Sequence, residues 1–143
     1  MSFNVLIVDD SVAMRAIIKK IIKISGFKMS QCFEAGNGRE ALEQLKQNWV
    51  DVIISDVNMP EMGGLELLQV LNQDPLYQNI SVIIVSTEGS SERIREALMR
   101  GAKGFIKKPF LPEDIRKVLH NVIGVGVDGE YQEDREDADN GDF

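Results

Sequence analysis

The stretch "NVLIVDDSVAMR" (residues 4–15) decides the fold. Apolar, largely β-branched residues run directly into two carboxylates, Asp9 and Asp10, and a short apolar run of this kind is typical of a buried strand. From residue 12 the apolar residues recur at helical spacing and share one face (Met14, Ile17, Ile18, Ile21 and Ile22), with Arg15, Lys19 and Lys23 away from it. The stretch therefore predicts a strand followed by an amphipathic helix, with two repelling carboxylates at the junction.

The same alternation continues to the end of the ordered pattern. Strands are expected at 3–8, 30–35, 50–55, 80–85 and 104–107. Helices are expected at 12–24, 38–47 and 65–73, then after a cap at Ser90 or Ser91, and finally after Pro112. Strands that alternate with helices predict an α/β fold, a doubly wound five-stranded parallel sheet with helices on both faces. Ligands of such sheets bind beyond the carboxyl ends of the strands.

Composition narrows the class of protein. The chain has 143 residues, of which 43% are hydrophobic, and this fits one globular domain. Apolar runs fall short of the roughly 18 residues that a membrane span needs. The lone cysteine, Cys32, indicates a reducing, cytoplasmic setting. We expect no nucleic-acid partner, because no basic patch dominates the sequence.

The net charge of −7 is concentrated at the C-terminus. Eight acidic residues and one base, Arg135, lie within residues 128–143, and residues 1–127 are neutral overall. We therefore predict a domain over 1–127 and an acidic, disordered tail over 128–143. A solubilising role and an interaction role for this tail both stay open.

Chemically reactive side chains follow four of the expected strands. Asp9 and Asp10 follow the first, Asp56 the third, Ser86 the fourth and Lys108 the fifth. A single aspartate after a strand is commonly a helix cap, but compatible groups at neighbouring strand ends indicate a site. Clustered carboxylates call for a hard divalent cation, and Mg²⁺ prefers oxygen ligands. The set fits formation of an acyl phosphate on a carboxylate, with Asp56 as nucleophile.

Four motifs carry a family resemblance: "IVDDS", "IISDVNMPEMGG", "VIIVSTE" and "GFIKKPF". In this order they resemble a response-regulator receiver domain of the stand-alone chemotaxis (CheY-like) type, over about residues 4–123. The resemblance implies a flavodoxin-like (βα)5 fold with strand order 2-1-3-4-5. It also implies a two-component signalling protein that receives a phosphoryl group from a histidine kinase and is not a turnover enzyme.

The resemblance assigns roles at the acidic positions. Asp56 would be the phospho-acceptor. Asp10, Asp56 and the backbone carbonyl of Asn58 would bind Mg²⁺ or Mn²⁺ directly, and Asp9 would bind it through a water molecule. Lys108 would contact the phosphoryl group and precede a cis peptide bond to proline.

The resemblance also assigns roles to residues that respond to phosphorylation. Ser86 would be the switch hydroxyl and Phe105 the aromatic residue that rotates inward. Asn58 and Glu88 would tune dephosphorylation. Phe105 stands where the best-known chemotaxis members have tyrosine, so a flagellar-motor target of the enteric kind does not follow from the resemblance.

Partners follow from the same resemblance. We expect a cytoplasmic monomer that meets a CheA-like sensor histidine kinase. Its protein target would bind the face built from the fourth helix, the strand at 104–107 and the last helix, with the flagellar motor switch and a phosphatase as candidate partners. The alternatives are a receiver of another phosphorelay, the receiver part of a longer regulator, and a scaffold that works without phosphorylation. A haloacid-dehalogenase-type phosphatase would need a second aspartate at position 58, where the chain has Asn58.

Overall fold

The computed structural model describes residues 2–123. Its strands are β1 (Phe3–Val8), β2 (Met29–Ala35), β3 (Val52–Asp56), β4 (Ser81–Ser86) and β5 (Gly104–Lys107). Its helices are α1 (Val12–Ser25), α2 (Gly38–Gln47), α3 (Gly64–Asn72), α4 (Ser91–Met99) and α5 (Pro112–Ile123). The predicted acidic tail over 128–143 lies outside the described residues, as does the end of the predicted domain, and both stay predictions.

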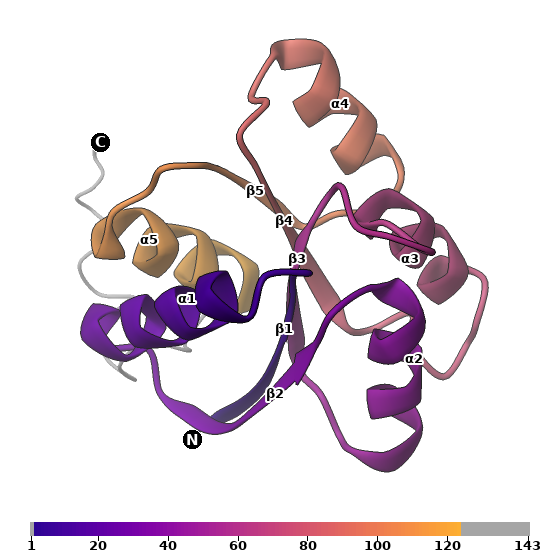
Figure 1. The fold of residues 1–143 in the computed structure, drawn as a ribbon, viewed down its shortest axis with the longest axis horizontal. Coiled ribbons are helices and arrows are strands. Elements are labelled where there is room, and N and C mark those ends of the chain that lie inside the picture. The colour runs from indigo at the N-terminus through magenta and orange to yellow at the C-terminus, as the bar shows by residue number, and fades with distance from the viewer. Residues whose placement is uncertain (1, 124–143) are drawn as a thin grey trace.

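The strands form one parallel sheet in the order β2-β1-β3-β4-β5. Helices α1 and α5 cover one face, and α2, α3 and α4 cover the other (Figure 1). Successive strand residues point to opposite faces, so Ile53 packs in the core on the α2–α3 side and Ile54 in the core on the α1–α5 side. This explains why the central strands are apolar throughout instead of alternating. The predicted α/β fold and strand order are confirmed.

Two local expectations needed correction. Strand β3 begins at Val52, not residue 50, because Asp51 pairs with the start of β1: its N–H donates to the Asn4 carbonyl and its carboxylate accepts the Asn4 N–H. Ile17 was expected on the buried face of α1 but is 49% exposed, whereas Ile18 and Ile22 are buried. Ile17 and Ile18 point about 100° apart around the helix, and the helix buries the side that holds Ile18.

The start of α4 settles an alternative that the sequence left open. Ser90 has an extended backbone, and its side chain accepts a hydrogen bond from the N–H of Arg93. Ser90 is therefore the N-cap, and Ser91 is the first residue of the helix. This cap fixes where the loop that follows β4 ends.

Candidate functional site

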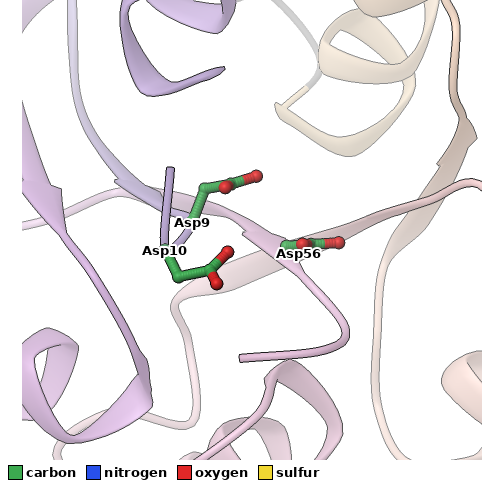
Figure 2. Close-up of side chains that lie close together, drawn as sticks. All are labelled: Asp9, Asp10 and Asp56. Atoms are coloured by element: carbon green, nitrogen blue, oxygen red, sulfur yellow. The ribbon is translucent and has the colours of Figure 1, made fainter. Parts of the chain in front are cut away.

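Three carboxylates meet at the carboxyl edge of the sheet. Strands β1 and β3 are neighbours, with Val8 opposite Ser55, so the residues that follow Val8 lie beside Asp56. Figure 2 shows Asp9, Asp10 and Asp56 side by side, and one oxygen of each lies within 4.8 Å of the others. Asp9 is buried, Asp56 is half-buried and Asp10 is exposed. The structure thus brings the predicted acidic residues into one pocket that solvent reaches from the Asp10 side.

Asp9 is held in place on both sides of its carboxylate. Its Oδ1 accepts a hydrogen bond from the Ser11 N–H at 2.9 Å, and its Oδ2 lies 3.5 Å from Lys108 Nζ. The Asp9 N–H donates to the Ala35 carbonyl, which extends the pairing of β1 with β2 by one residue. Asp9 is only 2% exposed, so these partners replace the hydration that its carboxylate loses on burial.

Asp56 interacts with charged groups that follow other strands of the sheet. Burial raises the pKa of its carboxyl group above the ordinary value; Lys108 and the Val57 N–H lower this pKa, while Asp9 and Asp10 raise it. The Val57 N–H donates to Asp56 Oδ1 at 2.9 Å, and Lys108 Nζ lies 3.7 Å from the same oxygen. One ammonium thus faces three carboxylates, and the remaining negative charge favours a bound cation.

The turn after β3 shapes the floor of the pocket. The Gly64 N–H donates to the Val57 carbonyl at 2.9 Å and closes the loop that contains Asn58. A Cβ atom at Gly64 would collide with the backbone carbonyl of Asp56. Glycine at this position therefore lets α3 begin directly behind Asp56.

Ser86 and Lys108 form the opposite wall. Ser86 is 3% exposed, and its Oγ accepts the Glu88 N–H at 3.0 Å. Its carbonyl accepts the Lys108 N–H at 2.8 Å, which ties the end of β4 to the residue that follows β5. The peptide bond between Lys108 and Pro109 is cis, as predicted. Lys108 Nζ lies 3.5 Å from Asp9 Oδ2 and 3.7 Å from Asp56 Oδ1.

The remaining predicted residues are Phe105 on β5, Asn58 in the loop after β3 and Glu88 in the loop after β4. Phe105 is half-buried and packs against the core on the α2–α4 side. Asn58 and Glu88 are exposed, and Glu88 forms an ion pair with Arg93 at 3.1 Å. Their proposed roles in switching and dephosphorylation stay predictions.

One contact was missed by the sequence analysis. Arg15, expected on the outer face of α1, donates from Nη1 to the Asp9 carbonyl at 2.5 Å and from Nε to Glu34 Oε1 at 2.9 Å. A positive charge is unfavourable near the start of a helix, so an arginine there suggests a partner without identifying it. Its partners become apparent only once β1 and β2 are paired.

The donor atoms fit a hard divalent cation. Carboxylate oxygens are the ligands that Mg²⁺, Mn²⁺ and Ca²⁺ prefer, whereas imidazole or thiolate ligands would indicate zinc or copper. Together with the half-buried Asp56 and the facing lysine, they define a class: a doubly wound α/β domain with an acidic cluster at the carboxyl edge of its sheet, whose oxygen atoms suit a hard divalent cation.

Comparison with known proteins identifies the family. The family of the response regulator receiver domain matches residues 5–120. The "Chemotaxis protein CheY homolog" of Campylobacter jejuni is 40% identical over 124 residues, which cover 86% of this chain and 94% of the relative. The "Chemotaxis protein CheY" of Thermotoga maritima is 39% identical over 123 residues, which cover 85% and 98%.

Solved structures agree with the sequence relatives. Chemotaxis response regulator CheY4 of Vibrio cholerae matches with a TM-score of 0.75 and 36% identity, over 85% of this chain and 99% of that chain. CheY in the CheX-CheY-BeF3-Mg+2 complex from Borrelia burgdorferi matches with a TM-score of 0.76 and 30% identity, over 85% and 89%. The chain belongs to the response regulator receiver domain family, and it is CheY-like.

Family membership has two direct consequences. Receiver domains bind Mg²⁺ in an acidic pocket, and this chain has the corresponding cluster of aspartates. They interact with histidine kinases and protein targets and are not classical turnover enzymes, so the phosphatase alternative loses its basis. Within residues 2–123, the structure contains no helix long and apolar enough to cross a membrane.

Proposed function

We propose that this chain is a single-domain response regulator that accepts a phosphoryl group on Asp56 from a sensor histidine kinase. The observation that carries this proposal is the cluster of Asp9, Asp10 and Asp56 with Lys108 facing it. This arrangement combines a nucleophilic carboxylate, oxygen ligands for Mg²⁺ and a positive charge for the incoming group.

The proposed transfer is a displacement at phosphorus. An Asp56 carboxylate oxygen forms a bond to phosphorus while the bond from phosphorus to the kinase histidine breaks, and its electron pair stays on the imidazole nitrogen. Lys108 stabilises negative charge on the phosphoryl oxygens. Asp10, Asp56 and the carbonyl of Asn58 would hold Mg²⁺, with Asp9 acting through water. Bound Mg²⁺, or Mn²⁺, neutralises charge in the transition state.

The proposed output is a change of binding surface. Ser86 would turn toward the phosphoryl group, Phe105 would follow, and the face formed by α4, β5 and α5 would gain or lose a protein partner. Asn58 and Glu88 would set the dephosphorylation rate. We propose that the molecule acts as a cytoplasmic monomer.

Chemotaxis is the pathway that the relatives support. Proteins with this role in their names align over nearly their whole length, and the Borrelia burgdorferi relative was solved bound to CheX. A CheA-like kinase, the flagellar motor switch and a phosphatase are the corresponding proposed partners. A receiver from another phosphorelay would use the same pocket, so the pocket does not identify the pathway. The proteins captured by the phosphorylated and the unphosphorylated form distinguish a chemotaxis pathway from another phosphorelay.

Phosphorylation by a small donor tests the proposal directly. With acetyl phosphate and Mg²⁺, the wild type should gain the mass of one phosphoryl group, and Asp56→Asn should gain none. Intact-mass spectrometry gives the readout. Asp74→Asn is the matched control, since the Asp74 carboxylate accepts the Leu76 N–H in the loop after α3 and the amide oxygen of asparagine can accept the same bond. Equal behaviour of the wild type and Asp56→Asn would contradict the proposal.

A further inference from the structure

Arg15 occupies an unfavourable position for a cation. It is the fourth residue of α1, where the positive end of the helix dipole disfavours positive charge. Its side chain is only 15% exposed, so much of its hydration is lost as well. A buried arginine at such a place needs strong partners.

The partners of Arg15 belong to two different strands. Nη1 donates to the carbonyl oxygen of Asp9, directly after β1, at 2.5 Å, and Nε donates to Oε1 of Glu34, on β2, at 2.9 Å. Glu34 lies opposite Ile7 in the pairing of β1 with β2. The planar guanidinium has the fixed fork of donors that such a double contact requires. Arg15 therefore connects the start of α1 to the ends of both strands.

The Asp9 carbonyl is the important partner, because it belongs to the peptide group that leads into Asp10. Arg15 fixes the orientation of this peptide group from one side. On the other side, the Ser11 N–H donates to Asp9 Oδ1 at 2.9 Å. Asp10 itself is exposed, so the backbone on either side of it determines where its carboxylate points.

We propose that Arg15 is a positioning residue of the cation site: by holding the Asp9 carbonyl, it orients Asp10 toward Asp9 and Asp56. This inference rests on the proposed function, in which Asp10 binds Mg²⁺ directly. Arg15 acts through the backbone and does not touch the cation or the phosphoryl group.

The affinity for Mg²⁺ is the quantity that this role predicts will change. Arg15→Met keeps an unbranched side chain about as long as the aliphatic part of arginine and removes both hydrogen bonds. We expect its dissociation constant for Mg²⁺, measured by isothermal titration calorimetry, to rise about tenfold, as for other residues that orient metal ligands. Arg39→Met removes an arginine that pairs with Glu61 on the surface, at 70% exposure, and should leave this constant unchanged.

Phosphorylation kinetics separate positioning from general destabilisation. In Arg15→Met, the Mg²⁺ concentration for half-maximal phosphorylation by acetyl phosphate should rise in parallel with the dissociation constant. The maximal rate at saturating Mg²⁺ should stay within about twofold of wild type, because the nucleophile and Lys108 are intact. A purely structural role would lower the melting temperature without changing the Mg²⁺ dependence.

Arg15→Lys keeps the test decisive if Arg15→Met does not fold. A single ammonium lacks the fork that spans the Asp9 carbonyl and Glu34, so we expect several-fold weaker Mg²⁺ binding. If the wild type is phosphorylated normally and either folded variant binds Mg²⁺ with wild-type affinity, the role of Arg15 is overturned and the proposed function stands. A wild type that neither binds Mg²⁺ nor becomes phosphorylated would overturn the proposed function, and this inference with it.

Discussion

The negative charge around the carboxyl group of Asp56 is larger than the charge of its single lysine partner can offset. Burial is the largest contribution to its raised pKa, Lys108 and the Val57 N–H oppose it, and Asp9 and Asp10 add to it. In the absence of a cation, the ionised form of Asp56 is therefore less favourable in the folded protein than in the unfolded chain. In the proposed function Asp56 must be ionised to attack phosphorus, so the proposed nucleophile is also a residue that destabilises the fold when it is charged.

This conflict predicts a pH-dependent stability difference between the wild type and Asp56→Asn. The folded pKa lies above the unfolded value, so the stabilising effect of a protonated Asp56 is present below the unfolded pKa and is lost as the pH rises through the folded pKa. At pH 7 without divalent cations, Asp56→Asn should melt a few degrees higher than the wild type. The difference should shrink as the pH falls toward 3.8, the ordinary pKa of an aspartate carboxyl group.

Thermal denaturation in EDTA at several pH values measures this difference. Asp10→Asn should also raise the melting temperature at pH 7, because it removes one of the charges that repel Asp56. Added Mg²⁺ should raise the melting temperature of the wild type more than that of either variant. A lower melting temperature for both variants in EDTA would show that repulsion is not the dominant effect.

Individual site residues differed in how far the sequence could predict them. Asp9, Asp10 and Asp56 could be placed together because each lies at or just beyond the carboxyl end of a strand in a parallel sheet, and strand ends share an edge. The contact of Arg15 could not, because its acceptors depend on the register between β1 and β2 and on a backbone carbonyl. Backbone acceptors leave no mark on the sequence.

At the scale of the element, the β3–α3 turn has the strictest steric requirement near the site. Gly64→Ala should destabilise the domain by about 1–3 kcal/mol, because the new Cβ meets the backbone carbonyl of Asp56 and backbone cannot move aside as a side chain does. Gly36→Ala is the matched control, since its Cβ would lie 3.1 Å from Oε1 of the long, flexible Glu40 side chain.

Urea denaturation of the two variants tests this argument. Gly64→Ala should unfold at a clearly lower urea concentration than the wild type, and Gly36→Ala should remain close to it. Equal midpoints for the two variants would mean that the turn after β3 adapts to a larger residue.

Elements were predicted well where periodicity alone decides them, and less well where tertiary contacts do. All five strands and five helices were expected from alternating apolar patterns. The predicted start of β3, residue 50, was wrong by two residues. Val50 is apolar and buried like a strand residue, but it precedes the strand, and Asp51 bonds to Asn4. The position of Ile17 was wrong because the apolar stripe of α1 is wider than the face that the sheet covers.

At the scale of the whole molecule, the site is linked to a distant surface by the two strands at one side of the sheet. Ser86 ends β4 inside the pocket, and β4 pairs with β5, where Ile84 lies opposite Phe105. Phe105 packs against the core on the side that α2, α3 and α4 cover. We therefore expect a change at Ser86 to reach the α4–β5 region through packed residues of adjacent strands and not through the loops alone.

This arrangement predicts that Ser86→Ala separates phosphorylation from the remote response. The variant should still gain a phosphoryl group on Asp56, because the nucleophile, the carboxylates and Lys108 remain. It should lose most of the phosphorylation-dependent change in amide hydrogen exchange over α4 and β5, because no hydroxyl is present to turn toward the phosphoryl group. Ser81→Ala changes a serine at the opposite end of the same strand and should respond like the wild type. If the hydrogen exchange of α4 and β5 changes equally in Ser86→Ala and Ser81→Ala, the signal must leave the pocket by another route. The ion pair between Glu88 and Arg93 at the start of α4 would then be the next contact to test.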